Sequence, residues 1–589
     1  MSEEFGTTRA ETLPAGETPP AAADAAPAAP AQKHSGFSRI LNQWFHHIDR
    51  GGSLRSEVTV GIVLCILSVC GMFINLQLIS GMLVSGAYDT ATTAEIAANG
   101  EIIATMYFVS MLIAFVGSLV IGLVARLPFV QVSGLGLSTV MISLIGTSTG
   151  LSYYNLLAVC FVSSVVYAAV VALPPVKRFL FQALPQSVRK AIPAAMGVLL
   201  AFVALQLSGV ISVSGSALPI FGVGDSISSA SGSVQLSGIL GISLFDYTTD
   251  RFHPTLLLSG IFCIVTIVLV LVFKARKAKH PYLWSLLIST VVYILLTILL
   301  VNVNWANMSL SFDSLLGRAW MVGSEDAMIN HLGAVFSNLS IGKIFSEGFD
   351  FSAYTAAGGN VALLFIAGIF TMLAACLYGN EATMRATVEK GGYEMSKKER
   401  TIALLCNAGI NVVAPLFNGS PVAIGTESVA GAEDNAKSGI ASVVAAIGFA
   451  ISMFIWVIPA VFVTYTSQDI QMNLYGHYGV VLQLLTNCSF AFADTIMVMV
   501  GLSMVKNSLD IDWKDFREFA PWIVTIAGTF FLSNVAWGLA LGVVAYTLIQ
   551  VVSAPAPGMK KLESLRGVGV PVYVLTLISV LLVILAAML

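Results

Sequence analysis

Residues 130–139, VQVSGLGLST, and residues 420–429, SPVAIGTESV, show the same unusual pattern inside apolar surroundings. Each begins with a short stretch that alternates apolar and polar side chains, which favours a β-strand, and then passes through Gly or Ser into a helical pattern. A strand within a long apolar run interrupts a helix. Both stretches therefore predict a broken segment in a chain that is otherwise helical.

The chain as a whole is too apolar for an ordinary soluble domain. Of its 589 residues, 57% are hydrophobic and 10% are charged, and the formal net charge is −3. Apolar runs recur from residue 57 onward, and a run of about 20 residues is long enough to cross a hydrocarbon core about 30 Å thick. No water is available there to satisfy backbone groups, so helices are required. The composition predicts an all-α polytopic protein of the lipid bilayer.

Fourteen membrane-spanning segments are predicted, and the broken stretches fall in the third and the tenth. With seven spans in each half, the two broken segments occupy matching positions, and an odd number of spans makes the two repeats inverted in the membrane. The alternative is a pair of loose Gly-rich helix contacts. The expected spans are 57–82, 102–125, 130–147, 152–173, 190–211, 254–273, 282–302, 358–380, 400–417, 421–433, 438–464, 486–505, 520–533 and 535–552, and the last apolar run, 569–589, is either a further crossing or a peripheral helix.

The orientation follows from the distribution of Lys and Arg. Basic or mixed segments such as KARKAKH at 274–280 and MKKLESLR at 559–566 fall on one side when the spans are threaded in order. The loops around 85–101, 212–253 and 303–357 fall on the other side and are poor in Lys and Arg. Because cytoplasmic loops carry the excess of basic residues, we expect a multi-pass protein of the cell membrane with a cytoplasmic N-terminus. The Ala- and Pro-rich residues 1–35 are predicted to be a disordered tail.

The broken segments are the predicted binding site. Non-helical backbone at membrane depth occurs only where it is buried in protein or lines a cavity. Glu427, at the start of the second half-helix, is placed where the helix dipole favours its ionised form and burial favours its neutral form. It could therefore accept an N–H group from a solute and also carry a proton. The alternative is an acid at the water boundary, which is common at helix starts.

Other polar side chains are weaker candidates for the same cavity. Asn75 in the first span could face it, although Asn also joins membrane helices to one another. Ser and Thr hydroxyls often bond back to their own helix, so each of them alone indicates little. These residues are Ser133, Ser138 and Thr139 in the third span, and Thr426 and Ser428 in the tenth.

The sequence contains no enzyme or metal-site pattern that we can identify. HExxH, CxxC and Walker motifs are absent, as is a Ser/His/Asp arrangement, and the seven histidines lie in predicted tails and loops. The seven cysteines lie in or beside apolar segments, which is typical of small buried side chains. We therefore expect no enzymatic activity, no cofactor, no metal and no nucleic-acid partner.

Several motifs together resemble the nucleobase:cation symporter family, and most closely its adenine, guanine and hypoxanthine permeases. The resemblance runs from about residue 50 to 556 and preserves the order of the motifs. They are SEVTVGIVLCILSVCGMFIN at 56–75, SGLGLS at 133–138, PQSVRKAIPAAMGVLLAFVALQLSGVI at 185–211, GTESVAG at 425–431, DIDWKDFREFAPWIVTI at 510–526 and WGLALGVVAYTLIQ at 537–550.

This resemblance implies two inverted seven-helix repeats, a core domain that moves against a gate domain, and a nucleobase held between short antiparallel strands of spans three and ten. It also implies proton-coupled import, with H⁺ ahead of Na⁺ as the coupling cation, and a homodimer. The implied divisions are 51–173 and 358–464 as core and 174–302 and 465–552 as gate. From composition and hydropathy we expect 1–50 to be a tail and juxtamembrane segment, 303–357 an extracytoplasmic loop, and 553–589 a linker and C-terminal hydrophobic helix.

Residue by residue, the resemblance aligns Glu427 with the family's span-ten glutamate, which contacts the base. Gly425, Thr426 and Ser428 flank it, and Gly134 matches the span-three glycine motif. Ser138 stands where this branch usually has Asn.

Span eight departs further from the pattern. The family's acid there lies three residues before a glycine, and aligning Gly379 with that glycine places Cys376 at the acidic position. A thiol is a weak donor and cannot replace a carboxylate as acceptor or proton carrier. Glu381, five residues later, could take over part of that role in substrate binding or proton coupling, although an ion pair with Arg385 at i+4 is the simpler interpretation.

The sequence therefore predicts a secondary-active permease that imports nucleobases, with purines such as adenine, guanine and hypoxanthine foremost. A transporter of the same fold that carries a different small solute, such as an organic or inorganic anion, is the alternative. Glu427 argues against that alternative, since a fixed negative charge repels an anion.

The Cys376→Asp variant tests the departure in span eight. If Cys376 lies at the substrate, the restored carboxylate should change substrate preference or the pH dependence of uptake. Uptake of labelled bases by cells expressing the variant measures both, and an unchanged profile would place Cys376 outside the site.

Overall fold

The protein is described by a computed structural model. It describes residues 36–83, 93–133, 151–207, 212–214, 233–235, 245–246, 251–252, 254–302, 336, 339, 342–356, 358–454, 495, 497–506, 508–532, 535–552 and 569–586. The predicted disordered tail, 1–35, lies outside these residues.

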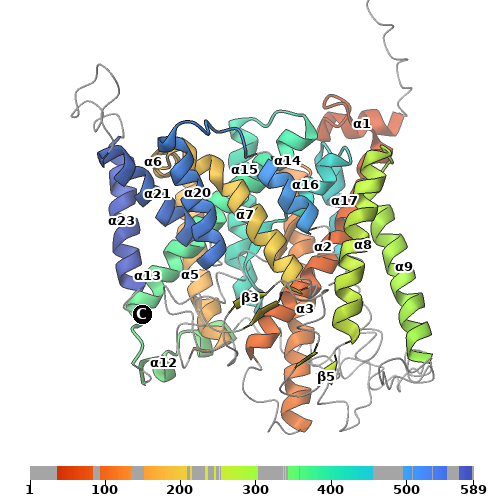
Figure 1. The fold of residues 1–589 in the computed structure, drawn as a ribbon, viewed down its shortest axis with the longest axis horizontal. Helices are drawn as coiled ribbons and strands as arrows, with labels where there is room; N and C mark the ends of the chain where they lie inside the picture. The colour runs from red at the N-terminus through yellow and green to blue at the C-terminus, as the bar shows by residue number, and fades with distance from the viewer. Residues whose placement is uncertain are drawn as a thin grey trace, which may run out of the picture.

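The described part of the chain is mostly helical, and its helices pack side by side into one bundle (Figure 1).

Two of the helices begin with a local capping group. Ser152 forms a capping box with Asn155, three residues later, and Ser396 forms one with Glu399. The main helices are α1 Gly36–Phe45, α2 Leu54–Leu83, α3 Thr93–Val120, α5 Tyr153–Ala172, α6 Pro174–Ala183, α7 Gln186–Leu207, α8 Pro254–Ala275, α9 Pro281–Asn302, α13 Val361–Ala374, α14 Asn380–Gly391, α15 Lys397–Val413, α16 Glu427–Glu433, α17 Gly439–Ser452, α20 Phe516–Leu532, α21 Val535–Val552 and α23 Val570–Ala586.

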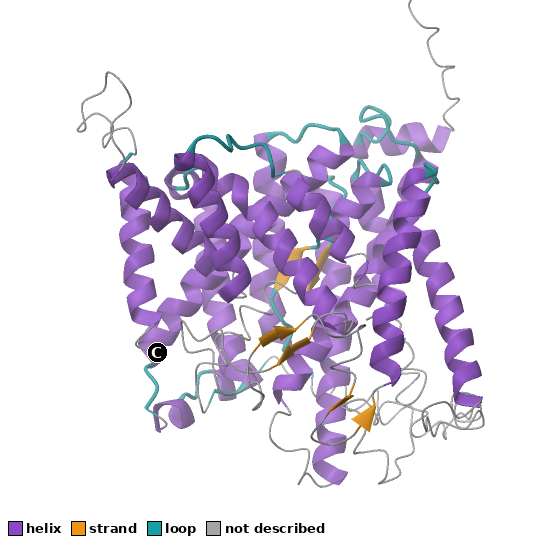
Figure 2. Ribbon diagram, in the orientation of Figure 1, coloured by secondary structure: helices purple, strands orange, loops and turns teal. Residues whose placement is uncertain are grey.

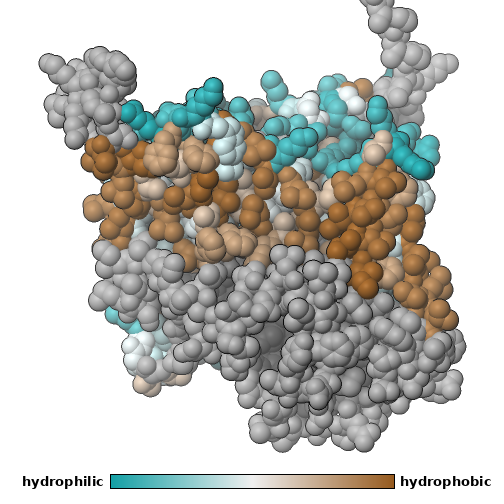
Figure 3. Space-filling view, viewed as in Figure 1, coloured by the Kyte–Doolittle hydropathy of each residue, from teal (hydrophilic) through white to brown (hydrophobic). Residues whose placement is uncertain are grey.

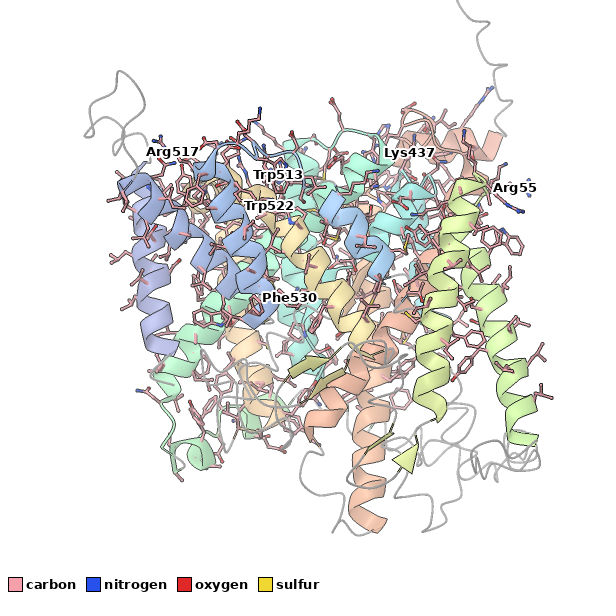
Figure 4. All side chains as sticks on the ribbon, viewed as in Figure 1. Arg55, Lys437, Trp513, Arg517, Trp522 and Phe530 are labelled. Atoms are coloured by element: carbon pink, nitrogen blue, oxygen red, sulfur yellow. The ribbon has the colours of Figure 1, made fainter. Side chains whose placement is uncertain are left out.

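Many of these helices have the length and composition of membrane spans. Within the described residues, five continuous helical stretches are long and apolar enough to cross a bilayer. Figure 3 shows an apolar belt below a hydrophilic rim, and Figure 4 places Arg55, Lys437 and Arg517 at the end of the bundle that carries this rim. The five stretches are Thr105–Ala125, Tyr153–Ala172, Val361–Gly391, Lys397–Phe417 and Val535–Val552, and shorter apolar helices cover Ile261–Ala275, Pro281–Tyr293, Gly439–Ser452, Met497–Lys506 and Val570–Leu581.

The eighth predicted span continues well beyond its expected end at residue 380. A π-helical turn, η6 (Ala375–Gly379), joins α13 directly to α14, so the helix runs on to Gly391. The sequence of α14 is too polar to extend a hydropathy-based span, yet most of its residues are buried. Its contacts with α16 and α7 replace the lipid contacts that an apolar sequence would make.

The two broken segments meet as a strand pair inside the bundle (Figure 2). Strand β1 (Gln131–Ser133) lies antiparallel to β6 (Val422–Ile424). Gln131 is opposite Ile424, and Ser133 is opposite Val422. Beyond Ser133, the predicted third span lies outside the described residues.

Amide side chains satisfy the outer edge of β6. Asn411, on α15, accepts a hydrogen bond from the Val422 N–H through Oδ1 (2.8 Å) and donates from Nδ2 to the Val422 carbonyl (2.6 Å). Asn380, at the start of α14, accepts from the Ile424 N–H (2.8 Å) and donates to Asn407 (2.7 Å). These bonds supply the partners that a two-stranded sheet inside a membrane protein otherwise lacks.

The outer edge of β1 is satisfied from α3 and from the β6 side. The Gln131 N–H donates to the Ser118 hydroxyl (2.8 Å), and the Gln131 side chain donates to the Gly117 carbonyl (3.1 Å). The Val130 N–H, just before β1, donates to the Ser428 hydroxyl (3.1 Å). Helices on both sides therefore fix the position of the strand pair.

Two further strand pairs lie in the predicted loop 212–253. Strand β2 (Ser212–Ser214) pairs with β3 (Ser233–Gln235), and β4 (Phe245–Asp246) pairs with β5 (Arg251–Phe252). The predicted loop 303–357 contains a π-helical turn, η5 (Ile344–Gly348), and the short helix α12 (Ser352–Ala356).

We predict that Asn411→Ala destabilises the protein by about 2–3 kcal/mol. It leaves the buried Val422 N–H without a partner and removes one of the two amide bonds to the Val422 carbonyl, which keeps its bond from Asn407 (3.1 Å). Thermal unfolding of the purified protein in detergent measures the loss. Asn360→Ala, which removes one N-cap bond to Leu363 at the start of α13, is the control and should cost about 1 kcal/mol. Equal stability of the two variants would contradict the role assigned to Asn411.

Candidate functional site

A cavity lies beside the strand pair, where helices from distant parts of the sequence converge. Its empty space is about 900 Å³, which includes the part open to solvent. Its walls are mostly apolar with a few polar groups, the usual make-up of a small-molecule site. The lining residues are Ser68, Gly71 and Met72 of α2, Val132 and Ser133 of β1, Met196, Leu199 and Leu200 of α7, Ala375 and Gly379 of η6, Asn380 and Thr383 of α14, Ala423 and Ile424 of β6, Gly425, Thr426, Glu427, Met497 and Val535.

Glu427 is the one acid in the lining of this cavity among the described residues. It begins α16, and only 7% of its surface is exposed. Its Oε2 atom is buried with no hydrogen-bond partner among the described residues. A buried carboxylate without a counter-charge is costly, which makes Glu427 the main candidate for a functional residue in this cavity.

Two glycines provide the space for this carboxylate. A Cβ atom added to Gly425 would lie 2.5 Å from Glu427 Oε2, and one added to Gly71 would lie 3.0 Å from Oε1. Gly71 comes from α2, far away in the sequence, and Gly425 connects β6 to α16. Both positions therefore require the smallest residue for the carboxylate to stay where it is.

The other residues predicted in the tenth and third spans divide into two groups. Gly425, Thr426 and Ser133 line the cavity, and the Ser133 hydroxyl is hydrogen-bonded to that of Ser420. Ser428 is fully buried and accepts the bond from Val130, so it supports the strand pair. Gly134, Ser138 and Thr139 lie outside the described residues, and Asn75 belongs to α2 with a side chain that also lies outside the described part.

Cys376 is not among the residues that line this cavity. It lies in η6, where its neighbours Ala375 and Gly379 do face the cavity, and it is 2% exposed within the same apolar cluster as Cys160 and Tyr167. An aspartate at 376 would be buried against apolar side chains, so Cys376→Asp should reduce the amount of folded protein.

Glu381 also lies outside this cavity. Both of its oxygens are bound by Arg400, with Nε 2.6 Å from Oε2 and Nη2 2.5 Å from Oε1, and Arg385 is farther away at 3.8 Å. Glu381 lines a second hollow together with Arg189, which is formed by α7, α14, α15 and the segment 508–510. The ion pair expected from spacing is present, but its main partner comes from another helix.

Several lining residues were not predicted from the sequence. Ser68, Gly71 and Met196 lie in apolar helices, where only the helical phase, unknown beforehand, decides which side faces the cavity. Asn380 is the last residue of the predicted eighth span and Thr383 lies beyond it, so neither is predicted as a site residue. The adjacent polar residues Asn380 and Glu381 were the available signal, but they do not reveal that the helix continues.

Comparisons with known proteins find relatives of one kind along most of the chain. The guanine/hypoxanthine permease PbuO of Bacillus subtilis is 20% identical over 511 residues, which is 86% of this chain and 94% of that protein. The adenine permease AdeQ of Escherichia coli is 21% identical over 518 residues, or 88% and 92% of the two chains. The chain is a homologue of purine permeases. The resemblance expected from the motifs is confirmed, and these homologues are transporters rather than enzymes.

Among solved structures, the transmembrane domain of a cyanobacterial bicarbonate transporter, BicA, matches 83% of this chain and 97% of its own, with 13% identity and a TM-score of 0.43. No family model matches the chain. Together with its apolar helices, the relationship to permeases makes this chain an integral membrane protein.

We predict that Gly425→Ala disturbs the site without unfolding the protein. The added methyl would meet the Glu427 carboxylate and the side chains of Val132 and Val130, and the carboxylate, as the end of a flexible side chain, would move. The affinity of the purified variant for a ligand in this cavity should fall by at least about tenfold, since the displaced Glu427 carboxylate loses its hydrogen bond to the ligand. Gly409→Ala is the control, because no atom lies within 4 Å of its added Cβ, and unchanged binding by Gly425→Ala would contradict the site.

Proposed function

We propose that this protein is a secondary-active permease that imports nucleobases, with purines as its principal substrates. The observation that carries the proposal is the buried, unpartnered Glu427 carboxylate in a cavity beside a strand pair. The names of its homologues, guanine/hypoxanthine and adenine permeases, support purines as the substrate class.

The lining suits a small planar base. Glu427 Oε2 can accept an N–H group from the edge of the base, and a site that hydrogen-bonds its ligand discriminates strongly against molecules lacking that group. The flexible side chains of Met196 and Met497 and the branched side chains of Leu199 and Val132 offer apolar contacts to the faces of the ring.

We assign proton coupling to Glu427. A neutral carboxyl and a carboxylate form different hydrogen bonds with a base. Proton uptake by Glu427 is therefore linked to binding of the base. Glu381, the other candidate, already has its charge balanced by Arg400. We therefore propose symport with H⁺, rather than Na⁺, through the acid that contacts the substrate.

The position of the cavity supports movement of a core domain against a gate domain. One wall comes from α2, β1, α14 and α16, which belong to the proposed core, and the other from α7, Met497 and Val535, which belong to the proposed gate. A ligand in this cavity would contact both units. Such a boundary is where substrates lie in transporters built from repeats.

A polar cluster crosses the same boundary at the far end of α16. The Glu433 carboxylate accepts hydrogen bonds from Lys274 Nζ (2.7 Å) and the Tyr282 hydroxyl (2.7 Å), both from the proposed gate, and lies 3.2 Å from Lys390 Nζ of the proposed core. Any sliding of core against gate must rearrange these bonds. We propose that they stabilise the conformation described here.

We further propose a homodimer in the plasma membrane with a cytoplasmic N-terminus. Arg55, Lys437 and Arg517 lie spread across the same end of the bundle, the end that carries α1, in agreement with an excess of basic residues on the cytoplasmic side (Figure 4). The anion alternative receives no support from the cavity, because its unpaired carboxylate would repel an anion.

Uptake of radiolabelled adenine, guanine and hypoxanthine by cells expressing the protein tests this function. We expect uptake of at least one purine and a strong reduction of that uptake by a protonophore. In Glu427→Gln the uptake rate should fall by about 100-fold or more, since an amide does not carry the proton and is a weaker hydrogen-bond acceptor than a carboxylate. Glu394→Gln, at an exposed acid, is the control. Absence of uptake for all three purines would contradict the proposed substrate class.

A further inference from the structure

A second buried polar group in the cavity wall lacks a partner. Ser68 lies on α2, is fully buried and lines the cavity. Its hydroxyl has no hydrogen-bond partner among the described residues, and in the lining it shares this property with Glu427 Oε2. Buried polar groups are nearly always hydrogen-bonded, so two such atoms in one cavity point to a ligand that supplies both partners.

The free hydroxyl of Ser68 differs from the hydroxyls of several other buried serines and threonines on the membrane helices. A buried serine or threonine in a helix commonly donates to the carbonyl four residues earlier. Ser163 and Ser164 of α5 do so at 2.6 Å, and Thr371 of α13 does so at 2.8 Å. Ser68 makes no such bond, so its hydroxyl remains available to the cavity.

Ser68 lies close to the place that Glu427 occupies. It precedes Gly71 by three residues, about 4.5 Å along the same face of α2. Gly71 is the point at which α2 approaches the Glu427 carboxylate, since an added Cβ would lie 3.0 Å from Oε1. The hydroxyl and the carboxylate are therefore neighbours in the wall of one cavity.

The two groups differ in chemistry. An ionised carboxylate only accepts hydrogen bonds, whereas a hydroxyl donates one and also accepts. We propose that Ser68 is a second substrate-binding residue. Its hydroxyl donates a hydrogen bond to an acceptor atom of the bound base, next to the N–H group of the base that donates to Glu427. This inference rests on the proposed function, and it specifies the substrate as a heterocycle whose edge carries a donor next to an acceptor.

Such an edge occurs in both purine classes. A 6-oxopurine presents a ring N–H beside an exocyclic oxygen, and a 6-aminopurine presents an amino group beside a ring nitrogen. A ring whose edge has no acceptor leaves the serine hydroxyl unpaired, and a ring whose edge has no donor leaves the carboxylate unpaired.

The test measures uptake kinetics of the purine that the wild-type protein imports. In Ser68→Ala we expect the half-saturating concentration to rise about tenfold with little change in maximal rate, because one hydrogen bond to the bound base is lost. Ser68→Cys keeps the size of the side chain with a weaker donor and should give an intermediate value. It also provides a measurement if the alanine variant is poorly expressed.

Ser579→Ala is the matched control. Ser579, on α23, is also fully buried with an unpartnered hydroxyl within the described part of the chain, but it does not line the cavity. Its substitution should leave the half-saturating concentration unchanged. Wild-type values in both Ser68 variants would overturn the role of Ser68 while leaving the permease function intact, whereas absence of purine uptake by the wild-type protein would overturn the function and this inference together.

Discussion

Backbone groups inside a membrane must find partners within the protein, and this structure meets that requirement at one difficult place. Two segments far apart in the sequence leave helical geometry at the same depth, and each provides a three-residue strand. The strands satisfy only their facing edges. Side chains of α3, α14, α15 and α16 satisfy the others, so the position of these helices depends on the same few hydrogen bonds as the strands.

This arrangement also explains why the cavity has so few free polar atoms. The amides of Asn380, Asn407 and Asn411 are occupied with one another and with β6. Thr383 donates to the Gly379 carbonyl, and Ser133 is bonded to Ser420. In the proposed site, chemical selectivity therefore falls to the few polar groups that make no hydrogen bond within the scaffold.

The sequence predicted the helical class and the two broken segments because hydropathy and β-propensity are local properties. It singled out Glu427 because an acid in an apolar chain stands out. It could not predict Ser68 or Gly71, whose place in the cavity lining depends on the rotation of α2 and on its approach to α16. Nor did it predict that Arg400 would bind Glu381, because spacing along one helix indicates Arg385 and contains no information about α15.

The π-turn η6 has a consequence for how sequences of distant homologues are compared. A π-turn contains an extra residue relative to an α-turn, so it rotates every later side chain about the helix axis. Ala375, Gly379, Asn380 and Thr383 face the cavity, and Cys376 packs elsewhere. Two proteins that differ in this one turn can align without a gap and still present different residues to their ligands. A column of such an alignment in span eight therefore gives the position of a residue along the helix, but it does not show which side of the helix the residue faces.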